Sequence, residues 1–136
     1  MKNEFEIIGD ITIIHIDYLD RKLKTFIDTA DLELVSSFTG KWGVVKQQGY
    51  KEKFYVIGAS KGKQMFMHRL IMNFPEGLDV DHINDDSLNN RRLTNLQAIT
   101  RSENVKKQDR SNIAYRRVKR GYAPIKEKLE RDQQAV

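Results

Sequence analysis

The feature that most constrains this chain is a polar stretch of 12 residues, Asn84–Asn95, that separates two short apolar segments. The flanking segments, Val80–Ile83 and Leu96–Ile99, are predicted to be strands. Only Leu88 and Leu93 are apolar in the stretch between them. A loop of this length is uncommon inside a compact domain, and when it is ordered it usually has a function. We therefore expect this loop to belong to a functional site.

A helix is predicted directly after the second of these strands. The residues Thr100-Arg101-Ser102-Glu103 fit the capping box S/T-x-x-E, in which the two outer side chains bond to backbone N–H groups at a helix start. The helix is expected to continue to about Asp109. This part of the chain is thus predicted as strand, long loop, strand and helix.

The first half of the chain is predicted to be rich in strands. Thr29 is expected to cap a short helix over Ala30–Phe38, and turn residues follow at Gly40 and Gly49. We expect a small antiparallel sheet with this helix packed against it. The predicted strands are Ile11–Ile16, Leu23–Ile27, Trp42–Lys46, Lys53–Ile57 and Gln64–Met67.

Composition excludes several classes of protein. The chain has 136 residues, which is about one domain, and it contains no cysteine. A disulfide scaffold, a cysteine-ligated structural zinc and a thiol nucleophile are therefore excluded. No apolar run approaches the ~18 residues of a membrane span, so we expect no membrane partner and a cytoplasmic protein.

The positive charge is concentrated at one end of the chain. Residues 91–136 carry 13 Lys and Arg against 5 Asp and Glu, whereas residues 1–60 and 61–90 are each slightly acidic. Tyrosines are interleaved with these cations, as in Tyr115-Arg116-Arg117. Such a block usually faces a polyanion, most commonly DNA or RNA. The alternative is a solvated tail that only aids solubility.

Four polar elements stand in a specific order over residues 68–107: Asp81-His82, Asn89-Asn90, Asn95-Leu96 and Asn104. This order resembles the HNH endonucleases, in the branch where the last His of the name is replaced by Asn. Members of that branch are often phage and bacterial homing-type nucleases. The resemblance implies a ββα-metal (His-Me finger) core that hydrolyses phosphodiester bonds.

The resemblance also implies a role for each matching residue. Asp81 and Asn104 would hold a divalent metal, His82 would be the general base, and Asn95 would tie the loop backbone and keep His82 oriented. These residue types suit the reaction, because an imidazole titrates near neutral pH. The two metal ligands offer only oxygen, which favours Mg²⁺, or alternatively Mn²⁺, over zinc.

Each of these residues also has a structural interpretation. His82 alone could be a packed strand histidine, and Asn104 could be a solvated helix residue. Asn89-Asn90 tolerates left-handed backbone, so turn formation is favoured there over ligation. His68 is expected to pack under the loop. It is the complete ordered set that favours catalysis.

The expected partner is duplex DNA. Arg91 and Arg92 in the loop could contact phosphates that flank the cut, and Arg101, Lys106 and Lys107 lie on or near the predicted helix. Arg116 and Arg117 continue the basic segment. A monomer with one site would nick one strand at a time. RNA remains an alternative substrate.

The sequence therefore predicts an α+β protein in three parts: a β-rich region at 1–67, an HNH ββα-metal core at 68–109 and a basic C-terminal extension at 110–136. The predicted activity is metal-dependent DNA cleavage, as a homing-type nuclease in a bacterial or phage-infected host cell. The alternative is a nucleic-acid-binding module that has the same fold but does not cut.

Overall fold

The computed structural model describes residues 1–47, 53–60 and 62–108, and its mixture of strands and short helices is of the α+β class, as predicted. Residues 101–108 form a helix at the end of the described part. The elements before it are β1 (Phe5–Ile8), β2 (Ile11–Tyr18), β3 (Arg21–Asp28), the 3-10 turn η1 (Thr29–Asp31), α1 (Leu32–Ser36), β4 (Gly43–Gln47), β5 (Lys53–Ser60), β6 (Lys63–Phe66), α2 (Met67–Ile71), β7 (Asp79–His82) and β8 (Leu96–Ile99).

The first sheet is an antiparallel meander in the order β1-β2-β3. Along β2, buried side chains alternate with more exposed ones, so that Thr12, Ile14 and Ile16 face the core. A two-residue turn joins β2 to β3, because Tyr18 pairs directly with Arg21. The two longer strands agree with the predicted ones, and β1 is an addition to them.

The helical segment after β3 is shorter than predicted. It consists of one 3-10 turn followed by α1, which ends at Ser36 rather than Phe38. The predicted cap at Thr29 is wrong: its hydroxyl donates to the carbonyl oxygen of Gly9 at 2.8 Å instead of accepting from the helix backbone. Thr29 therefore ties the helical segment to the turn between β1 and β2.

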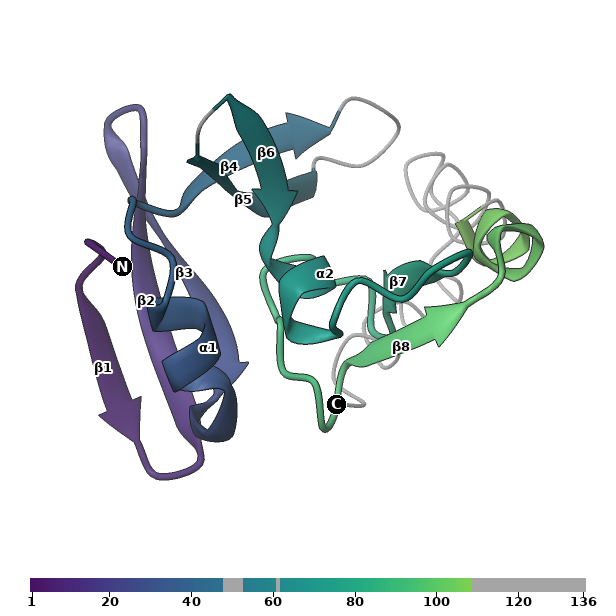
Figure 1. Cartoon of the computed structure of the whole chain (residues 1–136), viewed down its shortest axis with the longest axis horizontal. Coiled ribbons are helices and arrows are strands. Elements are labelled where there is room, and N and C mark those ends of the chain that lie inside the picture. Colours follow the sequence, from purple (N-terminus) through teal and green to yellow (C-terminus); the bar gives the residue numbers. More distant parts are fainter. Residues whose placement is uncertain (48–52, 61, 109–136) are drawn as a thin grey trace, which may run out of the picture.

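The strands β4, β5 and β6 form a second sheet, also antiparallel, rather than extending the first one. They match the three further strands predicted from the sequence, within a few residues at each end. Figure 1 shows this sheet above the central helix α2, with β1–β3 and α1 on one side and β7 and β8 on the other.

The third unit contains the two strands that flank the long loop. β7 and β8 pair antiparallel, with His82 opposite Leu96 and Asp79 opposite Ile99. The helix over residues 101–108 follows directly, and its start has the predicted cap, because the Glu103 N–H donates to the Thr100 hydroxyl at 3.2 Å. The segment is therefore a two-stranded hairpin followed by a helix (Figure 1).

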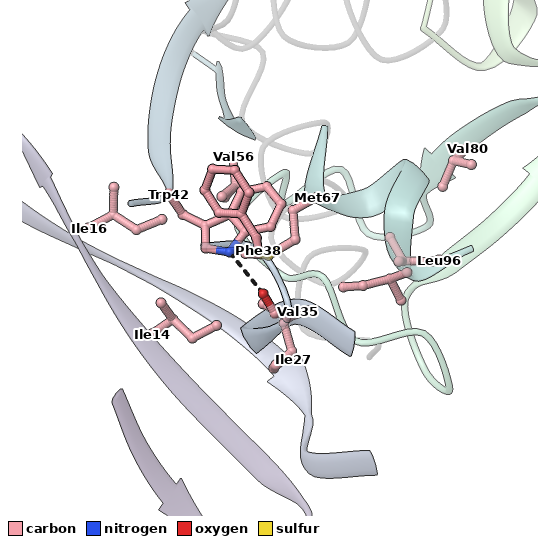
Figure 2. Packing of buried hydrophobic residues seen from close by; sticks show 11 residues of the cluster. Ile14, Ile16, Ile27, Val35, Phe38, Trp42, Val56, Met67, Val80 and Leu96 are labelled. Carbon is pink, nitrogen blue, oxygen red and sulfur yellow. Dashed lines mark hydrogen bonds between the residues drawn. The ribbon is translucent and has the colours of Figure 1, made fainter. Parts of the chain in front are cut away.

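One buried apolar cluster connects these units. Trp42 is its largest side chain, and its indole N–H donates to the carbonyl oxygen of Val35 at 3.3 Å (Figure 2). Phe38 packs on the Trp42 ring, with centroids 4.6 Å apart. Ile27 of β3 and Met67 of α2 belong to the same cluster. The N-terminal sheet and the segment around β7 therefore share a core.

The long loop is ordered and lies along β3. The Phe26 N–H donates to the carbonyl oxygen of Leu88 at 3.0 Å, and the Asn90 N–H donates to the carbonyl oxygen of Phe26 at 2.7 Å. The Ser87 hydroxyl also donates to the carbonyl oxygen of Phe54 in β5. Both sheets thus position the loop. None of the helices in the described ranges is long and apolar enough to span a membrane.

Candidate active site

A cleft of about 730 Å³ lies where β7 meets the second sheet, α2 and the last described helix. Asp81 and His82 both line it, although their side chains leave β7 on opposite faces. The other residues on its wall are Val45, Gln47, Lys53, Tyr55, Phe66, His68, Arg69, Asp79, Val80, Asp85, Ser87, Arg101, Asn104, Val105 and Gln108. The wall is thus built from both halves of the chain.

His82 is the last residue of β7 and is 5% exposed. Its Nε2 lies 2.8 Å from Oδ1 of Asn90. Burial lowers the pKa of the His82 imidazole, because the charged form loses solvation in this environment. The ring is therefore neutral at neutral pH, and a neutral ring can accept a proton.

Asn90 contacts His82, although the sequence predicts only a turn role for Asn90. Asn90 is 1% exposed, and its side chain reaches from the loop to the imidazole. The sequence offered little signal for this contact, because an Asn-Asn pair in a loop is equally typical of a turn.

Asn95 binds the loop backbone. Its Oδ1 accepts from the Asn84 N–H at 3.0 Å, and its Nδ2 donates to the carbonyl oxygen of Asn89 at 2.8 Å. The side chain is fully buried. Asn95 thus closes the loop across its base, and the direct bond to His82 comes from Asn90.

The Asp81 carboxylate is buried and already holds a positive group. Lys107 on the last described helix donates to its Oδ1 at 3.0 Å, and Gln97 on β8 donates to its Oδ2 at 2.8 Å. The same ammonium donates to the carbonyl oxygen of His82 at 2.8 Å. This position therefore accepts a cation between a carboxylate and a carbonyl oxygen. Lys107, predicted to contact DNA, binds within the protein here.

Asn104 faces the same side of β7 but bonds to a different carboxylate. Its Nδ2 donates to Oδ2 of Asp79 at 3.0 Å, and its Oδ1 receives only a long contact of 3.4 Å from Gln108. Arg101 also pairs with Asp79, at 3.0 Å, while most of its own side chain stays exposed. Asp79 and Asp81 lie two residues apart on one strand face, so Asn104 lies beside the Asp81 position.

Arg91 and Arg92 have partners within the N-terminal region. Arg91 Nε donates to Oδ1 of the buried Asp28 at 2.9 Å, and Arg92 Nε donates to both carboxylate oxygens of Asp31 at 3.2 Å. In the structure the charge of these two arginines faces acidic groups at and after the end of β3 and fixes the loop, and their predicted contact with phosphates stays a prediction. Lys106 is exposed, and Arg116 and Arg117 lie outside the described residues.

Aromatic rings form the wall next to His82. The His68 ring lies edge-on to it with centroids 5.0 Å apart, and Tyr55 and Phe66 pack against His68. Burial lowers the pKa of His68 to about 3, with the charges of His82 and Arg69 adding to the effect. His68 therefore packs beside the site as a neutral ring, in line with the expected packing role.

The groups around Asp81 that could hold a metal ion offer oxygen atoms. Within the described ranges, no three His, Asp or Glu side chains converge as a metal-binding group. The Asp81 carboxylate and the His82 carbonyl oxygen share the Lys107 ammonium, and the Asn104 amide bonds to Asp79, two residues from Asp81 on the same strand. Such donors suit a hard divalent cation, and the Lys107 ammonium already occupies the position as a positive group.

Residues 66–106 match the HNH endonuclease family model, from the end of β6 into the last described helix. This match confirms the resemblance of the segment to the HNH endonucleases. No curated protein and no solved structure matches the chain. The family indicates a nuclease, and hence a nucleic-acid substrate.

Proposed function

We propose that this chain is a divalent-metal-dependent endonuclease that hydrolyses phosphodiester bonds in duplex DNA. The observation that carries the proposal is the position of His82: it lines the same cleft as Asp81, and its ring is bonded at Nε2 to Asn90. The HNH match over residues 66–106 supports the same function.

His82 is the general base in this proposal. Burial lowers its pKa, so the ring is neutral and able to accept a proton from water at neutral pH. Nε2 is engaged with Asn90, which leaves Nδ1 as the atom that receives the proton. In the described part of the chain, Nδ1 has no hydrogen-bond partner.

Asp81 and Asn104 are the proposed metal ligands. Lys107 would have to leave Asp81, and the Asn104 amide would have to turn its oxygen from Gln108 toward the ion. A bound Mg²⁺, or alternatively Mn²⁺, would stabilise negative charge on the phosphate and on the departing 3′ oxygen. Asn95 would hold the loop, and through it Asn90, in place.

The proposed contacts to DNA come from cations that remain accessible. Arg101 is exposed beyond its bond to Asp79, and Lys106 is exposed on the same helix. The basic C-terminal segment, with Arg116 and Arg117, would add phosphate contacts. One site in a monomer would produce a nick. The resemblance supports a homing-type enzyme in the cytoplasm of a bacterial or phage-infected host cell.

The test is a plasmid assay with the full purified chain. Supercoiled plasmid is incubated with the protein and either Mg²⁺ or a chelator, and the products are separated on a gel. We expect nicked circles to accumulate with Mg²⁺ and not with the chelator. Plasmid that is retarded but stays supercoiled under both conditions would instead support the non-cutting binding module. Cleavage of structured RNA and not of duplex DNA would show that the substrate is RNA.

A further inference from the structure

We infer that Thr25 and Asn90 are positioning residues for His82, and that the N-terminal sheet thereby determines which ring nitrogen of the histidine is free to act. The role assigned to that nitrogen rests on the proposed function. Thr25 lies outside the hairpin and helix that carry Asp81, His82 and Asn104, because it is on β3, whereas Asn90 is in the loop that joins β7 to β8.

The two residues form a continuous hydrogen-bonded chain with the imidazole. Nδ2 of Asn90 donates to the Thr25 hydroxyl oxygen at 3.0 Å, and Oδ1 of Asn90 lies 2.8 Å from Nε2 of His82. Thr25 and Asn90 are both essentially fully buried. Water therefore does not replace any of these bonds.

The direction of each hydrogen bond follows from Thr25, which is the member of this series farthest from His82. The Thr25 hydroxyl donates its single hydrogen to the carbonyl oxygen of Leu88 at 2.7 Å, and a carbonyl oxygen can only accept. The hydroxyl must then accept from Asn90, so the NH₂ end of the amide faces Thr25. The amide oxygen consequently faces His82 and can only accept.

The imidazole must therefore carry its hydrogen on Nε2. A neutral imidazole has one N–H, so Nδ1 is left as the acceptor. The second donor hydrogen of the Asn90 amide is also used, because Nδ2 lies 3.7 Å from the Met67 sulfur. The amide is thus held in one orientation from two sides.

Backbone hydrogen bonds hold the loop that carries Asn90 in register with β3, which carries Thr25. Phe26, next to Thr25, accepts from the Asn90 N–H and donates to the carbonyl oxygen of Leu88. The loop cannot shift along β3 without breaking these bonds. Thr25 on β3, 57 positions before His82, therefore fixes which ring nitrogen of His82 carries the hydrogen.

The test reads the tautomer directly. The full chain is labelled with ¹⁵N-histidine, and ring nitrogens are correlated with ring protons by NMR at pH 8, where His82 is neutral. The chain has only three histidines, so single substitutions of His15 and His68 assign the spectrum. We expect His82 to be protonated at Nε2. Protonation at Nδ1 in the unmodified protein would overturn the inference, whatever the variants do.

Two matched variants test the role of Thr25. Thr25→Ser keeps the hydroxyl, whereas Thr25→Val keeps the shape and removes it. We expect Thr25→Ser to retain the Nε2–H tautomer, and Thr25→Val to give a mixture of tautomers with plasmid nicking slower by about 10-fold. An unchanged tautomer in folded Thr25→Val would contradict the inference. If the tautomer responds as expected but the unmodified protein never nicks plasmid, the positioning chain stands and the proposed function fails.

Discussion

His82 and His68 are both buried rings in the same cleft wall, and their bonding separates them. His82 is bonded at Nε2 to a buried amide and stands beside a carboxylate, whereas His68 is surrounded by the rings of Phe66, Tyr55 and His82. Burial alone would make either of them a packing residue. The hydrogen bond is what gives His82 a defined acceptor nitrogen.

At the residue scale, His68 predicts how stability depends on pH. Its folded pKa of about 3 lies below the unfolded value of about 6.5, so the folded state binds fewer protons between these two pH values. The stabilisation is fully present above pH ~6.5 and is lost as the pH falls toward 3. His68→Phe removes the titration and keeps an aromatic ring in place.

The measurement is the urea midpoint at pH 7.5 and at pH 5 for both proteins. We expect the midpoint of the unmodified chain to fall more between these pH values than that of His68→Phe. Burial also lowers the pKa of His82, so some loss of stability on acidification should remain in the variant. Equal losses in the two proteins would show that His68 is not held neutral by the fold.

Sequence and structure agree on single residues where the information is local. The apolar pattern predicts a strand over Val80–Ile83, and the structure has β7 at Asp79–His82, so both place Asp81 and His82 in this strand. The contact of Asn90 was out of reach, because it depends on Thr25, which is 65 positions earlier in the chain. The pairing of Lys107 with Asp81 was equally hidden, since a lysine next to a basic tail resembles a DNA contact.

At the scale of elements, the long loop is held by charge from the N-terminal sheet. Asp28, at the end of β3, accepts from Arg91 Nε at 2.9 Å and from the Leu93 N–H at 2.8 Å, and its side chain is 2% exposed. This carboxylate therefore carries two bonds that fix the loop. Asp28→Asn preserves the shape of the side chain and removes its charge.

We expect Asp28→Asn to lower the free energy of unfolding by about 2 kcal/mol, because it weakens charge-assisted bonds at a buried position. Asp17→Asn is the matched control, since Asp17 pairs with Lys41 in a solvent-exposed ion pair. The control should change stability far less, because solvent screens that pair. Urea unfolding curves of the three proteins measure both effects. Similar stabilities for the two variants would mean that the Asp28 bonds do not hold the loop.

The long loop could be predicted from the sequence, but the residues to which it is bonded could not. Its length and polar composition indicated an ordered functional segment, and the flanking strands were found where hydrophobic residues placed them. Its attachment to Asp28 and Asp31 involves residues about 60 positions away, and no periodic pattern records such pairs. Thr29 failed as a predicted cap for a related reason: a hydroxyl takes the nearest strong acceptor, which here is the carbonyl oxygen of Gly9.

At the scale of the whole molecule, the segment that matches the HNH family shares one buried core with the sheets that precede it in the sequence. Ile27 and Val56 from the sheets pack in the same cluster as Val80 and Leu96 from the nuclease hairpin. The cleft is likewise built jointly, because Tyr55 and Phe66 of the second sheet line it together with Asp81 of β7. The basic segment from 109 onward lies outside the described residues.

If His82 activates water for phosphodiester hydrolysis, removing its imidazole should slow cleavage without weakening the binding of DNA. The rate of plasmid nicking with Mg²⁺ is measured for the unmodified chain, for His82→Ala and for His15→Ala, with plasmid affinity measured alongside. His15 is a histidine of β2 that does not line the cleft. We predict that His82→Ala nicks at least about 100-fold more slowly while its affinity stays within about twofold, and that His15→Ala nicks normally. Nicking at the unmodified rate by His82→Ala would contradict the account.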